Sequence, residues 1–571
     1  MQSIKRRVVS ILLAVMLAMT VFVVTPVKAF AVDIPVTTQG SLSAALLAAS
    51  DFDTITLQND INYSADILVT GKTITINLNN HNLDITAASS FGLRVTGNAK
   101  ITILGPGTMT VTSNNSSYEA VMVDGSGSEL ALSGGAQLHV TGVNGGVLVN
   151  QGKATFSSVT INPTTAYAAA VRATDGSTVN VTGAVTAPTA TATLANYGVW
   201  AEGNSFVDVG GTIKATTGIT CSASRVTVWQ NVESISTLDG CEGVQASNGL
   251  VQIKGNVLVA TTGGNAHGVF SRGGGGVFID GNVSVIAVGD NARGLLADGG
   301  GFILVGSNVT VEANGDDARG VYSMDEDNSI IVLGDVIVKG GNNAYGVYAW
   351  HISPGKSPAS VVEIEGNVSV TGIDGTGVYT YGRESGGSAT KVTVGKDVNV
   401  TGTGGIGVNA DYYGQAIIDG TITAPTWIKV GTTGTVWLGD DIASVGPGIT
   451  GPETFKLNEG YAATATGVYT LTSLIPVTVT LDTTHGDKIV WNSTTKKLDI
   501  AAGLVEGTYT VVLTASNGIQ PDATLTFELT VEESLPPTGD ANMLALAIAT
   551  SALALGLVCV LAWRKRSRTV A

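Results

Sequence analysis

The chain has 571 residues, of which 29 are basic and 45 are acidic, and its formal net charge is −16. This acidic balance lacks the basic footprint that nucleic acids and anionic membrane surfaces require, so neither is expected as a partner. Glycine contributes 74 residues and charged residues only 13%. A chain rich in Val, Thr, Ile, Asn and Gly favours strands and tight turns over helices.

The first part of the chain predicts export. Lys5-Arg6-Arg7 precedes an apolar run over residues 8–24, and Ala29-Phe30-Ala31 offers a small-x-small cleavage site. This order is typical of a secretory signal peptide, which we place at residues 1–31. An uncleaved membrane anchor is the alternative. We expect the mature chain to begin near Val32.

A short amphipathic helix is predicted next, over residues 41–49, with Ser41 as its N-cap. It is followed by a long repetitive region of short strands. A helix in this place would cover the open edge of the first repeat, which would otherwise promote end-to-end aggregation.

Four segments repeat at a strict step of 26 residues, and each carries Gly and then an apolar residue at its fourth and fifth positions. They begin at Asn265, Asn291, Asp317 and Asn343. Weaker forms of the same Gly–apolar step raise the number of units to about 13, with spacings between 20 and 31 residues. A fixed period of this length predicts a solenoid.

Each unit contains three short alternating runs, which in one unit are Gly268–Ser271, Val277–Asp280 and Val283–Val285. Three brief strands cannot bury an apolar face alone, but stacked units can. Identical registers would place Val269, Leu295, Val321 and Val347 in one interior row. Because parallel strands stack at about 4.8 Å, 13 turns would give a rod on the order of 60 Å long.

This pattern resembles the right-handed parallel β-helix of pectate-lyase-like proteins and of many bacterial surface proteins. The resemblance is architectural, because no motif diagnostic of one subfamily is present. It implies an all-β solenoid of about 13 coils over residues 32–445. A β-sandwich array is the alternative, but it would not produce a strict step of 26 residues.

Bulky side chains are expected in one row on the outer surface. Side chains alternate along a strand, so the residue after each Gly–apolar pair points outward. Five consecutive turns then expose large groups, and two further aromatic residues lie two positions on. Contiguous exposed apolar surface marks contact sites, and flat rings suit sugars or another protein. Stacking that only stabilises the sheet is the alternative. The five are Phe270, Leu296, Tyr322, Tyr348 and Tyr379, and the two are Trp350 and Tyr381. The candidate ligand-binding residues are Phe270, Tyr322, Tyr348, Trp350, Tyr379 and Tyr381.

The β-helix family includes polysaccharide lyases and hydrolases, so an enzyme is an alternative. Polygalacturonase-like members use clustered aspartates with His-Gly and Arg-x-Lys steps, where paired carboxylates act as acid and base. His267-Gly268 resembles the first step, but Arg293, Arg319 and Tyr345 occupy the same register, so His267 is interpreted as one member of an outward row. The sequence therefore indicates no catalytic residue.

Lyase-like members hold calcium with several carboxylates. The densest acidic loop, Asp325–Asn328, is interpreted as a solvated turn, with a calcium site as the alternative. The sequence indicates no cofactor and no metal ligands. The register-sharing Asn265, Asn291, Asp317 and Asn343 are predicted to form a structural ladder through left-handed turns.

Two cysteines lie in the predicted mature chain. Cys221 and Cys241 either pair in an oxidising exterior or are unpaired, with Cys221 filling the core of a strand. Cys559 lies in a later apolar run.

The pattern changes over residues 446–533, where about seven short strands are predicted. The region resembles the putative-Ig modules of bacterial surface proteins, which implies a small immunoglobulin-like β-sandwich acting as a spacer. The predicted strands include Lys456-Leu457, Val468–Leu471, Val477–Leu481, Lys488–Trp491, Lys497–Ile500, Tyr509–Leu513 and Leu525–Leu529.

Residues 534–571 predict anchoring. Leu535-Pro536-Pro537-Thr538-Gly539 is followed by an apolar run from Met543 to Trp563 and by Arg564-Lys565-Arg566. The run is long enough to span a bilayer, and the basic cluster holds its end on the cytoplasmic side. This order resembles the cell-wall sorting signal of Gram-positive surface proteins. It implies that a sortase cleaves between Thr538 and Gly539 and joins Thr538 to peptidoglycan. An ordinary transmembrane tail anchor is the alternative.

These features together predict a secreted protein that is covalently attached to the cell wall, with sortase and peptidoglycan as partners. Without the signal peptide and the sorting signal, 21 basic and 44 acidic residues remain, a net charge of −23. We expect a non-catalytic adhesin that binds an extracellular glycan or protein. A polysaccharide lyase or hydrolase and a purely structural surface component are the alternatives.

Overall fold

The computed structural model describes residues 31–164, 167–187, 196–325, 327–351, 360–382, 389–431, 433–442, 446–519 and 521–533. The predicted signal peptide up to Phe30 and the sorting signal, including Leu535–Gly539, lie outside these residues. No helix in the described part of the chain is long and apolar enough to cross a membrane. The chain divides at Ser444 into two compact units.

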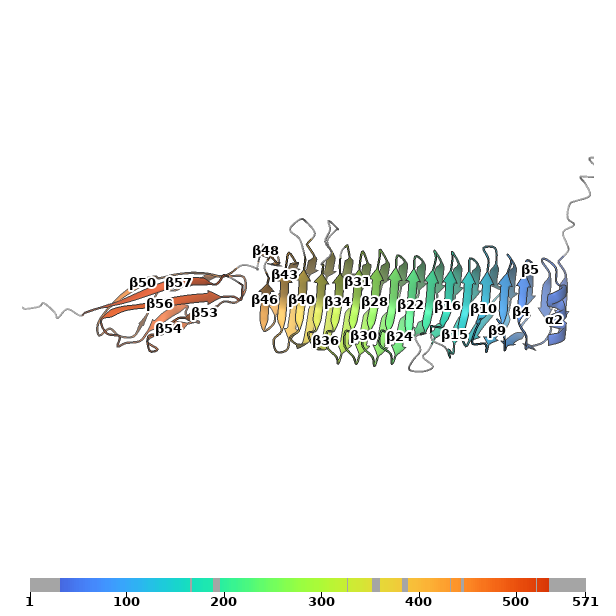
Figure 1. Cartoon of the computed structure of the whole chain (residues 1–571), viewed down its shortest axis with the longest axis horizontal. Helices are drawn as coiled ribbons and strands as arrows, with labels where there is room; N and C mark the ends of the chain where they lie inside the picture. The colour runs from blue at the N-terminus through green and yellow to red at the C-terminus, as the bar shows by residue number, and fades with distance from the viewer. Residues whose placement is uncertain are drawn as a thin grey trace, which may run out of the picture. The chain divides into compact units, whose positions relative to one another are not determined.

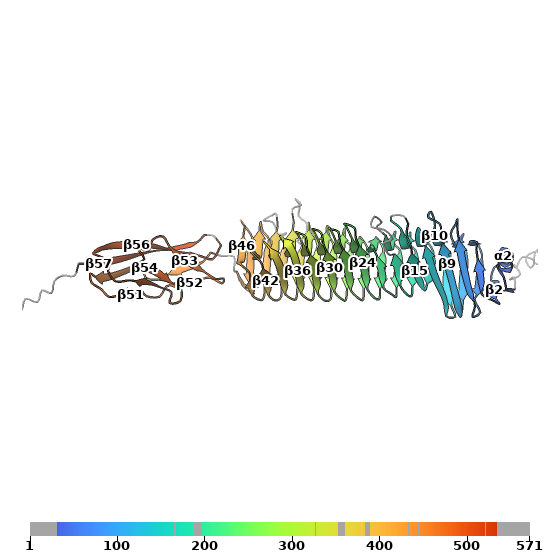
Figure 2. The same cartoon turned by 90° about the horizontal axis from the view of Figure 1, so that it is seen from below.

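The first unit is a parallel β-solenoid of about 13 turns with almost no helix, which confirms the predicted architecture (Figures 1 and 2). Within the stack, each turn contributes one strand to each of three sheets, in the chain order sheet 2, sheet 1, sheet 3, and sheet 1 has additional strands at its two ends. The three runs predicted for one unit correspond to β28, β29 and β30, whose bounds are given below.

Sheet 2 carries the Gly–apolar step. Its strands are β4 (Ile67–Thr70), β7 (Leu93–Thr96), β10 (Glu119–Asp124), β13 (Gly145–Asn150), β16 (Ala169–Thr174), β19 (Tyr197–Glu202), β22 (Thr217–Ser222), β25 (Glu242–Ser247), β28 (His267–Arg272), β31 (Arg293–Asp298), β34 (Arg319–Met324), β37 (Tyr345–Trp350), β40 (Thr376–Tyr381), β43 (Ile406–Asp411) and β46 (Thr426–Val430).

Sheet 1 follows sheet 2 in each turn. Its strands are β1 (Asp33–Val36), β2 (Thr54–Leu57), β5 (Thr73–Asn77), β8 (Lys100–Leu104), β11 (Glu129–Ser133), β14 (Lys153–Phe156), β17 (Thr178–Val181), β20 (Phe206–Val209), β23 (Arg225–Val228), β26 (Leu250–Ile253), β29 (Gly276–Ile279), β32 (Phe302–Val305), β35 (Ser329–Val332), β38 (Val361–Ile364), β41 (Lys391–Val394), β44 (Gln415–Ile418), β47 (Thr435–Leu438) and β48 (Asp441–Ile442).

Sheet 3 completes each turn. Its strands are β3 (Ile61–Tyr63), β6 (Asn82–Ala87), β9 (Gly107–Ser113), β12 (Ala136–Gly142), β15 (Ser158–Ile161), β18 (Val185–Ala187), β21 (Ile213–Ala215), β24 (Val232–Ser236), β27 (Val257–Thr261), β30 (Val283–Ala287), β33 (Val309–Ala313), β36 (Val336–Asn342), β39 (Val368–Ile373), β42 (Val398–Thr401) and β45 (Ile422–Thr423).

The core is a set of apolar columns that run through the stack. Val269, Leu295, Val321 and Val347 are successive partners in the register of sheet 2, and each is fully buried. The predicted interior row is therefore confirmed. One lap of the backbone per repeat brings residues 26 positions apart into direct contact.

The glycine of the Gly–apolar step is required by crowding in this core. A Cβ on Gly268 would lie 2.6 Å from Val283 Cγ1 and 2.5 Å from the carbonyl oxygen of Gly294. Both distances are shorter than real Cβ atoms tolerate. The step therefore marks a bend where two consecutive residues, Gly268 and Val269, face the interior before the strand resumes its alternation.

A helix covers one end of the stack, as predicted (Figure 1). Helix α2 (Gln39–Ala48) packs on β1, β2 and β3 and buries Leu42. Its N-cap is Thr38, three residues before the predicted Ser41. Ser41 instead completes a capping box, in which its backbone N–H donates to Thr38 Oγ1 at 3.2 Å and its hydroxyl accepts from the Thr38 N–H at 2.9 Å.

The prediction of a ladder at the start of each repeat is correct for the left-handed backbone conformation. It is wrong for the side chains, because the residues that bond between turns lie one position earlier. Asn265, Asn291, Asp317 and Asn343 have positive φ angles between 52° and 60°. The side-chain hydrogen bonds between turns belong to the preceding residues, where Asp316 N–H donates to Asp290 Oδ1 at 2.8 Å. The Asp290 carboxylate lies immediately before the left-handed residue Asn291, and there it faces the Asp316 amide of the next turn.

A longer ladder runs along the corner between sheets 1 and 3. The Asn282 N–H donates to Asn256 Oδ1 at 2.8 Å, and the Asn308 N–H donates to Asn282 Oδ1 at 3.1 Å. Asp335 N–H continues the series by donating to Asn308 Oδ1 at 2.8 Å. These bonds satisfy corner amides that the parallel ladders leave unpaired.

The two cysteines of the described chain are unpaired and buried, which excludes the predicted alternative of a disulfide between them. Cys221 occupies an interior position between Ala201 and Ala246 of the neighbouring turns. Burial raises the pKa of the Cys221 thiol to about 11 and that of the Cys241 thiol to about 12. Both side chains serve as small core residues.

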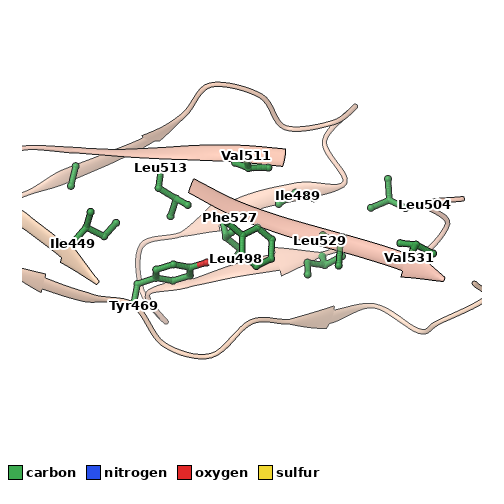
Figure 3. Packing of buried hydrophobic residues seen from close by; sticks show 12 residues of the cluster. Ile449, Tyr469, Ile489, Leu498, Leu504, Val511, Leu513, Phe527, Leu529 and Val531 are labelled. Atoms are coloured by element: carbon green, nitrogen blue, oxygen red, sulfur yellow. The ribbon is translucent and has the colours of Figure 1, made fainter. Parts of the chain in front are cut away.

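The second unit contains three sheets that share one core (Figure 3). The four-stranded sheet contributes Val511, Leu513, Phe527 and Leu529, the three-stranded sheet contributes Ile489, Leu498 and Ile500, and the two-stranded sheet contributes Ile449. All seven predicted strands overlap observed ones, whereas an immunoglobulin-like topology stays a prediction. The strands are β49 (Gly448–Thr450), β50 (Thr454–Asn458), β51 (Thr464–Ala465), β52 (Thr470–Thr472), β53 (Thr478–Leu481), β54 (Ile489–Asn492), β55 (Lys497–Ile500), β56 (Gly507–Ser516) and β57 (Ala523–Glu532).

Tyr469 anchors this second core. Its side chain is fully buried, and its hydroxyl donates to the carbonyl oxygen of Pro452 at 3.0 Å. Burial raises its pKa to about 12. The ring also meets Trp491 edge-on, with centroids 5.7 Å apart. A buried phenol satisfied in this way ties the residue before β52 into the shared core.

Candidate functional site

The register of sheet 2 places the predicted outward residues in one column. Phe270, Leu296, Tyr322, Tyr348 and Tyr379 are successive partners on β28, β31, β34, β37 and β40. The column continues to Gln245 on one side and to Asn409 on the other. The alternation of side chains therefore turns a sequence step into a line of side chains along the solenoid axis.

Three tyrosines of this column are in ring contact, and we call Tyr322, Tyr348 and Tyr379 the tyrosine row. The Tyr322 and Tyr348 centroids are 5.2 Å apart in an edge-to-face arrangement. Tyr348 and Tyr379 stack with centroids 4.7 Å apart and an interplanar angle of 24°. All three side chains are half-buried, so the row is both packed and accessible.

A second column, which sequence reasoning did not select, flanks the row. His267, Arg293, Arg319 and Tyr345 are register partners three residues before the row positions. The Gly–apolar bend brings these side chains against the row. Their 26-residue spacing is visible in the sequence, but the sharp bend at the glycine is not.

Arg319 lies at the centre of the aromatic cluster. Its Cζ is 4.9 Å from the ring centroids of both Tyr322 and Tyr348, and 5.7 Å from that of Tyr345. Tyr345 in turn meets Tyr348 edge-on at 4.9 Å. A guanidinium within about 6 Å of several ring faces is held by cation–π attraction, which fixes the rings as well as the charge.

Burial controls the protonation of this cluster. It raises the pKa of Tyr322, Tyr345, Tyr348 and Tyr379 above the usual value for tyrosine, so these phenols, which are neutral at physiological pH in any case, resist ionisation at higher pH as well. Burial, followed by the neighbouring charge of Arg319, lowers the pKa of Arg293. The surface therefore offers neutral rings and hydroxyl groups beside fixed positive charge.

The remaining predicted residues lie apart from the tyrosine row. Phe270 contacts His267 and Arg272 and is separated from Tyr322 by Leu296. The expectation that Leu296 is exposed is wrong, because its exposed fraction is only 4%. The larger side chains on the adjacent turns, Phe270 and Tyr322, flank this shorter residue and shield it from solvent.

Trp350 and Tyr381 lie side by side on neighbouring turns, two residues beyond the row positions Tyr348 and Tyr379. They are register partners on β37 and β40. Tyr381 contacts the ring of Tyr412, with centroids 4.9 Å apart, and Tyr412 carries no signal in the repeat. The long corner loops after both residues, 352–359 and 383–388, lie outside the described residues.

His267 is a member of a charged column. Its Nδ1 is 3.5 Å from Glu242 Oε1, and its Nε2 is 2.7 Å from an Arg293 terminal nitrogen. Glu242, His267 and Arg293 occupy three successive turns. The His267 side chain thus lies between the acidic Glu242 and the basic Arg293 side chains of the two neighbouring turns.

The acidic loop after β34 is organised by Asn328. The buried Asn328 side chain donates to the Met324 carbonyl at 2.6 Å and accepts from the Gly301 N–H at 3.0 Å. Asp325 and Asp327 adopt positive φ angles of 62° and 61°. Within the described residues, no group of three or more His, Cys, Asp or Glu side chains is placed to hold a metal ion.

The fold and this surface define the chain as a parallel β-solenoid protein with an aromatic surface on one sheet. Searches against protein-family models and against curated proteins found no match to it.

Proposed function

We propose that this chain is a Gram-positive surface protein, anchored to the cell wall, that binds an extracellular glycan or protein without catalysing a reaction. The observation that carries the proposal is the tyrosine row, in which rings on three consecutive turns are in contact and remain partly exposed. An extended ligand that lies along the axis would meet one ring per turn.

The cluster around Arg319 supports binding because it is already rigid. The backbone register positions each tyrosine, and cation–π contacts hold Tyr322, Tyr345 and Tyr348 around one guanidinium. Rings that are fixed before a ligand arrives lose little conformational entropy on binding. Tyrosine combines an apolar face with a hydroxyl, so it suits ligands that present both kinds of surface.

A purely structural role is the second candidate, and the same contacts favour it. Each aromatic pair stabilises a sheet by about 0.5–1.5 kcal/mol beyond its buried area. The two roles differ in what they predict for a ligand, so one series of variants separates them.

Replacing Tyr348 by alanine is expected to weaken retention of a ligand at least tenfold, about 1.4 kcal/mol. This variant removes ring contacts with Tyr322, Tyr345 and Tyr379. The measurement is retention of the full chain on an array of glycans and extracellular matrix proteins. Tyr348→Phe keeps the ring and is expected to bind like the parent.

Gln245→Ala is the matched control, because Gln245 occupies the same column away from the row. If the parent chain binds nothing on the array and Tyr348→Ala only lowers the unfolding temperature, the row is structural. If Tyr348→Ala and Gln245→Ala bind equally well, the row is not the binding surface.

The anchoring part of the proposal rests on Leu535–Gly539, the apolar run and the basic cluster. In a Gram-positive host with a sortase, the parent chain is expected to be released only by wall-digesting enzymes. Thr538→Ala is expected to leave the chain extractable with detergent. In the sorting signals that this segment resembles, the sortase cleaves after the threonine at this position. Pro537→Ala is the matched control, because the third position of the motif is free in the family that this signal resembles. Equal wall linkage of parent and Thr538→Ala would contradict the proposal.

A further inference from the structure

Two adjoining grooves lie on the outer face of sheet 1, a different face from the tyrosine row. They have volumes of about 410 Å³ and about 300 Å³, within the usual range for ligand sites. Phe206 and Arg225 line both grooves, which extend over strands β17, β20, β23, β26 and the start of β29. The two grooves therefore form one depression that crosses several turns.

The hollow arises from the side chains of one outward column. Phe206, Arg225, Leu250 and Gly276 are successive register partners. Gly276 contributes no side chain, so the column has a gap between Leu250 and its next member, Phe302. A Cβ there would lie 3.4 Å from the nearest Leu250 methyl carbon, so the glycine is not required by packing.

One aromatic side chain that lines this depression, and a second that is bonded to one of its lining residues, are more than half exposed. Phe206 is 54% exposed and Trp229 is 56% exposed. The Trp229 indole N–H donates to Asp208 Oδ1 at 2.7 Å, and Asp208 lines the smaller groove. This bond fixes the orientation of the indole at the groove edge and reduces the entropy that a ligand would have to overcome.

The polar lining is almost neutral overall. One cation, Arg225, and one anion, Asp208, occur among the lining residues, and the others include Asn180, Thr227 and Asn248. Arg225 donates to Gln252 Oε1 at 2.8 Å, an uncharged partner that leaves further guanidinium donors for a ligand. Amides and hydroxyls that both donate and accept match the hydroxyl groups of a sugar.

We propose that this depression binds a neutral oligosaccharide that crosses the sheet obliquely, from Phe206 on β20 to Trp229 just after β23. The apolar C–H faces of two sugar rings pack on Phe206 and Trp229, and the ring hydroxyls bond to Arg225, Asp208 and Asn180. Trp229 lies four positions beyond Arg225, the register partner of Phe206, so the two residues are about 13 Å apart along the strand direction. An oligosaccharide, rather than a single sugar, is needed to reach both. An acidic polymer fits less well, because Asp208 balances Arg225 in a chain with a net charge of −16.

The test is calorimetric titration of the full chain with cellohexaose and chitohexaose, which are neutral, and with hexagalacturonate, which is acidic. At least one neutral hexamer is expected to bind saturably and more tightly than hexagalacturonate. Phe206→Ala and Trp229→Ala are each expected to weaken that binding about tenfold. Both side chains are more than half exposed, so the thermal unfolding of the variants should match that of the parent.

One control variant separates this site from other exposed aromatic side chains. Tyr118→Ala removes another exposed ring, 43% exposed, on the loop before β10 and is expected to bind normally. The inference is overturned if neither neutral hexamer binds, if hexagalacturonate binds more tightly, or if the loss follows Tyr348→Ala instead of Phe206→Ala and Trp229→Ala.

Discussion

A Val311→Asp variant should lose about 4 kcal/mol of stability and open the turns around β33, because it buries a charge that has no partner. Val311 is fully buried and stacks between Val285 and Val338 of the neighbouring turns. A carboxylate in this column would meet only apolar side chains. Each turn is supported mainly by its two neighbours, so the damage should be greatest near the substitution.

The matched control is Thr310→Asp, one residue earlier on the same strand. Thr310 points outward between Ser284 and Ile337, so a carboxylate there stays in water. Denaturant unfolding gives the global change, and hydrogen exchange of β30, β33 and β36 gives the local one. Equal effects of the two aspartates would contradict the alternation on which the outward columns depend.

Gly320→Ala is expected to reduce the free energy of unfolding by about 2–3 kcal/mol, although it adds a single methyl group. The new Cβ would lie 2.4 Å from Val336 Cγ1 and 2.7 Å from the Gly346 carbonyl oxygen. The valine belongs to β36, two strands later in the same lap, and the carbonyl belongs to the next turn. Relief would require the backbone of two turns to separate, which also weakens their parallel hydrogen bonds.

Gly276→Ala separates this crowding from the general effect of replacing a glycine. Gly276 lies on β29 with its missing side chain directed outward, and the nearest atoms to a new Cβ are 3.4 Å and 3.5 Å away. We expect a change within about 0.5 kcal/mol, as for ordinary surface substitutions. Urea unfolding of both variants makes the comparison. A Gly320→Ala protein as stable as Gly276→Ala would show that the Gly–apolar step has another cause.

The arrangement of the candidate site follows only in part from the sequence. The step of 26 residues predicts that Tyr322 and Tyr348 are neighbours, because a fixed period places equal positions on successive turns. It does not predict that Arg319 lies among their rings, because that contact depends on the bend at Gly320. It also does not predict that Leu296 is shielded, since burial depends on the size of the residues above and below it.

The grooves on sheet 1 could be predicted from the sequence even less than the tyrosine row. Phe206, Arg225 and Gly276 fall in turns of different length, so no fixed spacing connects them. Only the register of the folded sheet aligns them. Trp229 likewise gains its fixed orientation from Asp208 on the preceding turn, through a single hydrogen bond.

The amino-acid sequence alone determines the solenoid and its interior columns, because a period in apolar residues is a direct record of which side chains can share a core. The motifs that predict export and wall attachment are likewise read from the residues themselves. The outer surface was decided by the tertiary structure. There, the sharpness of each corner and the relative size of stacked neighbours select which side chains meet, and both depend on residues from adjacent turns rather than on local order.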